Sequence, residues 1–74
     1  MKVSVDVYTK DIKAGTEAFQ AALAAGATDV RIQSNEDWET KEFEHLNLMF
    51  EVDHSNAVMN ILDAGPFVKD SSDL

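Results

Sequence analysis

Cysteine is absent from this chain of 74 residues. No disulfide can therefore support the fold, and the sequence gives no sign of an oxidising compartment. Long apolar runs are also missing, since none approaches the roughly 20 residues that a membrane-spanning helix needs. Ser4 and Asp6 interrupt the valines near the N-terminus, where a signal peptide would need a continuous apolar region. We therefore expect a cytoplasmic protein.

Basic residues are scarce: six lysines and arginines stand against 14 acidic residues, for a net charge of −8. Neutralising the phosphates of a nucleic acid requires clustered lysine and arginine, and the chain has no such cluster. The same shortage disfavours binding to an anionic membrane. The acidity fits simple solubility, a cation-binding surface, or a partner protein that is itself basic.

The length corresponds to a single domain over residues 1–74. A chain of this size buries only about 60% of the surface that it exposes when unfolded. Domains below roughly 70–80 residues often need disulfides, a metal or a partner subunit for stability. Because disulfides are excluded, the remaining options are a self-sufficient core, a metal or oligomerisation.

Alternation of apolar and polar residues predicts three strands, and helical spacing predicts a helix after the first and the third. Within the strands we expect alternate residues to face the core: Val3, Val5 and Val7, then Val30 and Ile32, then Leu46, Leu48, Phe50 and Val52. The predicted strands are Lys2–Tyr8, Asp29–Ser34 and His45–Val52, and the predicted helices are Ile12–Ala25 and Asn56–Ala64.

The ends and faces of the two helices are also predictable. Thr9 or Asp11 is expected to cap the first helix, and Asp53 or Ser55 the second. Gly15 costs about 1 kcal/mol in a helix interior, so the regular first helix is expected to begin near Thr16. Gly26 and the Gly65-Pro66 pair are the expected stops. The predicted apolar faces are Ile12, Phe19, Ala22 and Leu23 in the first helix, and Val58, Ile61 and Leu62 in the second.

This order of elements predicts an α+β, ferredoxin-like β-α-β-β-α(-β) fold, with an antiparallel sheet and two helices packed on one face. Only residues 66–74 remain for a fourth strand, which we expect to be short or absent, with 69–74 frayed. One sheet edge would then be poorly covered, and exposed edges pair with other chains. Homodimerisation through that edge or through the open sheet face is the expected consequence.

Residues 35–44 form an acidic segment that is long for a hairpin loop. We expect an extended two-stranded arm or a mobile loop. Its carboxylates could imitate a phosphate backbone, with Trp38 and Phe43 as anchors, since interface hot spots favour tryptophan. The alternative is a solvated hairpin with Trp38 folded over the domain edge. The candidate partner-binding residues are Glu36, Asp37, Trp38, Glu39, Glu42 and Phe43.

The open face of the predicted sheet is mixed in character. Its only aromatic residue is Tyr8, and Asp6 and Glu51 make it acidic, so RNA binding is not expected. Tyrosine, arginine and methionine are enriched at protein interfaces, so Tyr8, Arg31, His45 and Met49 form a second candidate partner surface. The alternative is a solvated face with scattered residues.

Signals for catalysis, a cofactor or a metal are missing. His45 and His54 lie on different elements, and the acidic segment lacks the ligand order and glycine of a calcium loop. No serine lies in a nucleophile motif, and no glycine-rich loop could cradle a phosphate. We therefore expect a protein that is not an enzyme and that carries no cofactor or metal.

The layout resembles the ACT domain, a small ferredoxin-like ligand-sensing module. The similarity rests on the strand Val3–Tyr8, the passage Leu23–Val30, and the segment Leu48–Asp53 that leads into Ala57–Gly65. The resemblance implies an amino acid or similar ligand at the interface of paired domains, held by the loop after the first strand, here Thr9, Asp11 and Gly15. The chain departs from the family because Asp11 is not soon followed by glycine and the last strand is short.

Two functions remain open at this point. The first is a non-enzymatic, acidic protein-interaction module, in a specific version an inhibitor or adaptor of a basic partner that handles nucleic acid. The second is an ACT-like sensor of a small molecule such as an amino acid, acting as a dimer.

Overall fold

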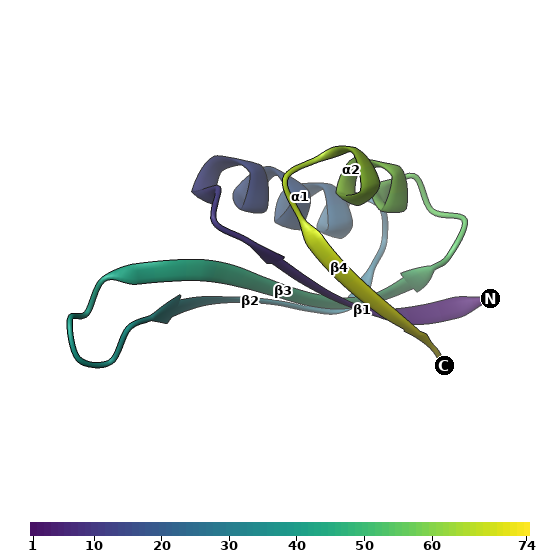
Figure 1. The fold of residues 1–74 in the computed structure, drawn as a ribbon. Helices are drawn as coiled ribbons and strands as arrows, with labels where there is room; N and C mark the ends of the chain where they lie inside the picture. The colour runs from purple at the N-terminus through teal and green to yellow at the C-terminus, as the bar shows by residue number, and fades with distance from the viewer.

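The computed structural model describes residues 1–74 and shows four strands in one antiparallel sheet, with both helices on the same face (Figure 1). The strand order across the sheet is β2-β3-β1-β4. This is the ferredoxin-like α+β arrangement that the sequence predicted. In chain order the elements are β1 (Lys2–Thr9), α1 (Ile12–Ala24), β2 (Thr28–Glu36), β3 (Phe43–Asp53), α2 (Val58–Ala64) and β4 (Val68–Asp73).

The core lies between the two central strands and the helices. Val5 pairs with Phe50 and Val7 with Leu48 across β1 and β3, so their side chains share the helix-covered face. The predicted inward residues of both strands are confirmed. The buried hydrophobic residues are Val3, Val5, Val7, Ala18, Ala22, Leu46, Leu48, Phe50, Val52, Val58 and Leu62.

Helix α1 contacts the sheet through small residues. Its buried positions are Gly15, Ala18 and Ala22, which recur at helical spacing on one face. Asp11 caps the helix by accepting a hydrogen bond from the Ala14 amide at 2.9 Å. The helix begins at Ile12, so the expected start near Thr16 is wrong. Gly15 lies inside the helix at a close approach to the sheet, where a Cβ atom would meet Leu46 and Thr9.

The close approach along this small-residue face leaves larger apolar side chains outside the core. Leu23 is 52% exposed and Ile12 is 57% exposed, so their predicted burial is wrong. Helix α2 buries Val58 and Leu62, one turn apart, whereas Ile61 remains 45% exposed and is a further correction.

The predicted cap of α2 is also wrong. Neither Asp53 nor Ser55 caps the helix, whose N-cap position is Ala57 without a side-chain hydrogen bond. The Asn56 side chain instead accepts a hydrogen bond from the Val58 amide at 3.0 Å. The Val58 amide, which has no partner within the helix, is thus hydrogen-bonded by a residue just before the N-cap position.

Strand β4 corrects the expectation of a frayed end. Residues 68–73 pair with β1 from Tyr8–Val68 to Val3–Asp73, so this strand is short but present. Its sequence is polar, and pairing with β1 satisfies backbone groups that would otherwise lie at an open edge. The exposed edges of the sheet are therefore β2 and β4, not β1.

Strand β2 is an edge strand, and its burial is weaker than predicted. Val30 packs against the core, but Ile32 is 39% exposed because an edge side chain has a neighbouring strand on one side only. The pairing with β3 shifts register between Thr28 and Arg31, where Asp29 has a φ of 51°. Asp tolerates this left-handed conformation better than most residues.

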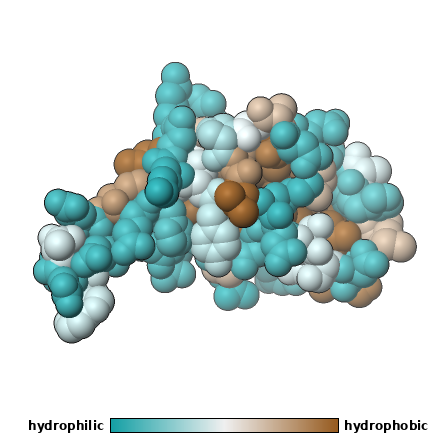
Figure 2. All heavy atoms as spheres, in the orientation of Figure 1, coloured by the Kyte–Doolittle hydropathy of each residue, from teal (hydrophilic) through white to brown (hydrophobic).

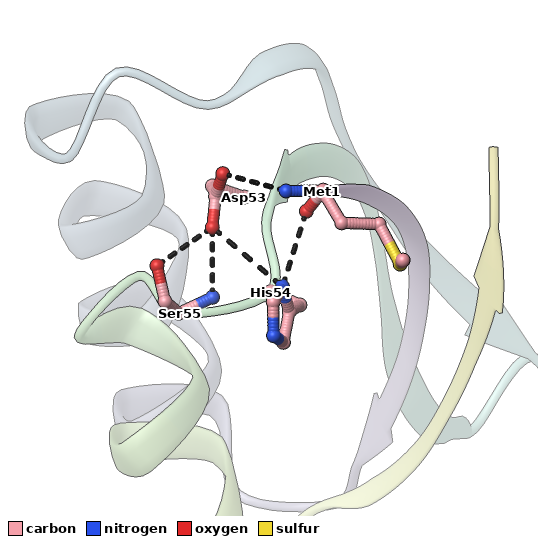
Figure 3. A network of polar contacts seen from close by, with 4 residues as sticks. All are labelled: Met1, Asp53, His54 and Ser55. Atoms are coloured by element: carbon pink, nitrogen blue, oxygen red, sulfur yellow. Dashed lines mark hydrogen bonds and ion pairs between the residues drawn. The ribbon is translucent and has the colours of Figure 1, made fainter.

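A polar network ties the start of β1 to the end of β3 (Figure 3). Asp53 accepts hydrogen bonds from the Ser55 hydroxyl at 2.6 Å and the Ser55 amide at 3.0 Å, and it contacts the Met1 ammonium at 3.1 Å. The Ser55 hydroxyl, the Ser55 amide and the ammonium together hold the pKa of Asp53 well below its ordinary value of 3.8.

Asp53→Asn should therefore weaken the acid sensitivity of the fold. A carboxyl whose folded pKa is depressed contributes stability above its unfolded pKa, and this contribution is lost as the pH falls below about 4. We expect a lower Tm at pH 7 for the variant and a smaller further drop between pH 5 and pH 3, measured by far-UV circular dichroism. Equal pH dependence in both proteins would contradict this role.

Candidate functional site: the acidic arm and the groove at its base

The hairpin of β2 and β3 extends beyond the rest of the sheet as a projecting arm, residues 35–44 (Figure 1). The β1–β3 pairing ends at Thr9–Leu46, so the arm has no further strand beside it. At its base Asn35 opposes His45 while Glu36 opposes Phe43, which leaves Glu44 as an extra residue in a β-bulge. Bulges bend a strand pair locally. The strands of the arm pair as far as Glu36 and Phe43, and residues 37–42 form the turn that joins them.

The tip of the arm is an ordered turn built on Asp37. Its carboxylate accepts hydrogen bonds from the Glu39 amide at 2.9 Å and the Thr40 amide at 3.0 Å. The backbone closes the turn through Lys41 N to Asp37 O at 2.7 Å and Asp37 N to Glu42 O at 2.8 Å. The Thr40 and Glu39 amides lower the pKa of Asp37. Asp37 is therefore a structural residue of the turn as well as one of its charges.

The arm displays charge and one large aromatic side chain to solvent. Its carboxylates take part in none of the three ion pairs of the chain, which involve Asp53 twice and Asp63 once. Trp38 is 79% exposed, so the alternative in which it folds over the domain edge is wrong. Phe43 is 37% exposed. Figure 2 shows the arm as a mostly hydrophilic projection beside a more apolar body.

Trp38→Ala should leave the free energy of unfolding within about 0.5 kcal/mol of the parent value, because exposed side chains contribute little. Urea unfolding followed by far-UV circular dichroism measures this, since Trp38 is the only tryptophan and its loss removes the fluorescence signal. A loss of several kcal/mol would show that the indole packs on the body of the protein.

A groove of about 690 Å³ opens at the base of the arm, where β1 ends. It combines residues from the end of β1, the loop into α1, β3 and the approach to β4. Tyr8 and His45 form an edge-to-face ring pair with centroids 5.1 Å apart. Val68 lies opposite Tyr8 in the β1–β4 pairing and is 72% exposed. The lining residues are Tyr8, Thr9, Lys10, Asp11, His45, Pro66 and Val68.

Thr9 holds the walls of the groove together. Its buried hydroxyl donates a hydrogen bond to the Pro66 carbonyl at 2.8 Å and accepts one from the Asp11 amide at 3.1 Å. The loop into α1 and the loop into β4 are therefore fixed to the same side chain. Gly15 lies behind Thr9, with its Cα facing the Thr9 methyl group.

The structure divides the candidate residues of the open sheet face. Tyr8 and His45 line the groove at the base of the arm. Arg31 and Met49 pair across β2 and β3 and line a smaller hollow of about 170 Å³ farther along the sheet. Buried Asn47 separates the two, donating hydrogen bonds to Asp6 and to the Val7 carbonyl. The four residues therefore line two separate hollows of the sheet.

The three residues predicted to hold a ligand also lie in different surroundings. Thr9 and Asp11 line the groove, whereas Gly15 is buried beneath it in α1. Lys10, which lies within the predicted loop segment, also lines the groove, as do Pro66 and Val68, which were not predicted. Predicting Pro66 and Val68 would have required predicting that β4 pairs with β1. The polar sequence after Val68 gives no local indication of this strand.

No protein-family model matches the sequence, and no curated protein matches it. Among solved structures, the fold is similar to LarC2, described as the C-terminal domain of a cyclometallase involved in the synthesis of the NPN cofactor of lactate racemase, in its apo form. The TM-score is 0.58 at 12% sequence identity, over 99% of this chain and 56% of that chain. The chain thus spans little more than half of that domain, and the likeness concerns the fold. Neither α1 nor α2 has the length and apolar character needed to cross a bilayer.

Proposed function

We propose that this protein is a non-enzymatic interaction module that binds a basic protein partner through its acidic arm. The observation that carries the proposal is the ordered turn at the tip, which presents Trp38 at 79% exposure among unpaired carboxylates. A fixed turn lowers the ordering cost of binding. An exposed tryptophan supplies the apolar anchor that interface hot spots favour.

The specific form of the proposal is an inhibitor or adaptor of a partner that handles nucleic acid. Such a partner has a basic groove for phosphates, and the arm brings several carboxylates to one narrow projection of the chain. Binding of this kind depends on charge, so it should weaken as salt screens exposed charges over about 8–10 Å.

A pull-down with matched charge variants tests the proposal. The arm variant Glu36→Gln/Glu39→Gln/Glu42→Gln removes three charges from the arm. The control Glu17→Gln/Asp29→Asn/Asp73→Asn removes three from exposed positions elsewhere, so both have the same net charge. We expect the parent and the control to capture the same basic protein at low salt, and the arm variant to bind it at least about tenfold more weakly. Equal loss in both variants would overturn the role of the arm.

The groove favours a second candidate function, an ACT-like sensor of a small molecule such as an amino acid, acting as a homodimer. It contains two of the three residues that the resemblance assigns to ligand binding, Thr9 and Asp11. A ligand that binds the folded state raises its Tm. A thermal-shift screen of the amino acids, combined with light scattering for oligomeric state, tests this candidate. A clean monomer with no shift from any amino acid would remove it.

A further inference from the structure

The sheet contains a notch beside the arm. Strand β1 leaves the sheet after Thr9, its last paired residue, and the chain turns into α1. Strand β3 continues past this point to Phe43, paired only with β2. Figure 1 shows the arm running on beyond the end of β1. Residues 43–45 therefore have an open strand edge on the side where β1 lies.

The groove lies in this notch and has apolar surfaces next to the open edge. His45 belongs to the open edge itself, and its ring forms an edge-to-face pair with Tyr8. Tyr8 and Val68 then continue side by side across β1 and β4. An extended chain entering the notch would thus find backbone partners on β3 and apolar contact surface on Tyr8 and Val68. Strand addition to an open sheet edge is a common mode of peptide recognition.

The charges around the notch indicate the chemistry of the occupant. Glu42 and Glu44 flank the open edge on β3, and Asp11 lines the groove. Lys10 is the only lysine or arginine in the groove lining. Against a net charge of −8, a positively charged segment is favoured over an acidic one or over a second copy of this chain.

We infer that the groove docks an extended, basic segment of the protein partner, which adds a short strand to the open edge of β3 and places an apolar side chain against Tyr8 and Val68. This inference rests on the proposed function and adds a second contact to it. The arm provides charge and the Trp38 anchor, while the groove fixes direction and register, because strand addition aligns backbone groups and selects alternate side chains.

Synthetic peptides test the inference with defined probes. The test peptide alternates lysine with valine around one central leucine. The first comparison peptide carries N-methyl groups on alternate amides, which block strand pairing, and the second replaces lysine by glutamate. Trp38 fluorescence reports contact with the arm, and backbone amide NMR shifts of residues 43–45 report strand addition.

Val68→Ser and Ile61→Ser form a matched pair of protein variants. Each replaces an exposed β-branched residue by serine without changing charge, the first in the groove and the second on α2. We expect Val68→Ser and peptide N-methylation each to weaken binding of the test peptide at least about tenfold, whereas Ile61→Ser has little effect. The glutamate peptide should not bind.

The outcomes separate this inference from the proposed function. If the arm variant weakens peptide binding but Val68→Ser and N-methylation do not, the arm function stands and the groove inference is overturned. Loss of self-association in Val68→Ser would assign the groove to a second copy. A Tm increase with an amino acid that Val68→Ser abolishes would assign it to a small molecule. Either result overturns the peptide assignment.

Discussion

Leu62→Ala should lower the free energy of unfolding by about 2–5 kcal/mol, whereas Leu23→Ala should lower it by less than about 1 kcal/mol. Both substitutions exchange leucine for alanine in a helix, so the change in helix propensity is the same. The difference lies in burial, since Leu62 is 2% exposed and Leu23 is 52% exposed. Removing the Leu62 side chain leaves a cavity among core residues that cannot fully collapse.

Urea unfolding followed by far-UV circular dichroism measures both values. A domain of this length has a total stability of roughly 4–11 kcal/mol, so Leu62→Ala brings it close to the limit of folding. Leu62→Val, which removes less volume, keeps the comparison measurable if the alanine variant is unfolded. Equal losses for the two leucines would contradict the packing of α1 described above.

The same pair of leucines shows what the sequence can predict. Helical spacing placed both on apolar faces, and this is correct as a statement of periodicity. Which part of the face meets the sheet depends on how close the helix lies, and Gly15, Ala18 and Ala22 determine that distance. Small residues carry little hydrophobic signal, so the predicted face of α1 included Ile12 and Leu23 and left out Gly15 and Ala18. The strands were easier, because alternation in Val3–Val7 and Leu46–Val52 permits only one buried face.

Strand β4 shows where prediction from sequence fails. Residues 69–73 are Lys-Asp-Ser-Ser-Asp, which have neither apolar alternation nor β propensity. They form a strand because β1 presents an open edge beside them, a tertiary cause that no local pattern records. The β4 side of the groove was missed for this reason, since Val68 reaches it through this pairing. The arm was easier to identify as a candidate because its composition differs from that of the rest of the chain.

Gly15→Val should destabilise the fold by about 1–3 kcal/mol, the usual range for forcing extra volume into a packed core. A Cβ atom at this position would lie 2.7 Å from Leu46 Cδ1 and 3.0 Å from Thr9 Cγ2. Gly15→Ala should cost less, because alanine gains about 1 kcal/mol of helix propensity over glycine and the Leu46 side chain can partly move aside. Ala24→Val, at an exposed position near the end of α1, introduces the same branched side chain away from this contact and serves as the control.

The two valine variants also connect the packing of α1 to peptide binding in the groove. Valine pushes against Thr9, whose hydroxyl bonds to both Pro66 and Asp11 in the groove lining. We therefore expect Gly15→Val to shift the amide NMR signal of Asp11 and to weaken the test peptide more than its stability loss explains, while Trp38 still reports contact with the arm. Ala24→Val should leave the Asp11 signal and peptide affinity unchanged. If both valine variants bind the peptide like the parent, Thr9 does not control the shape of the groove.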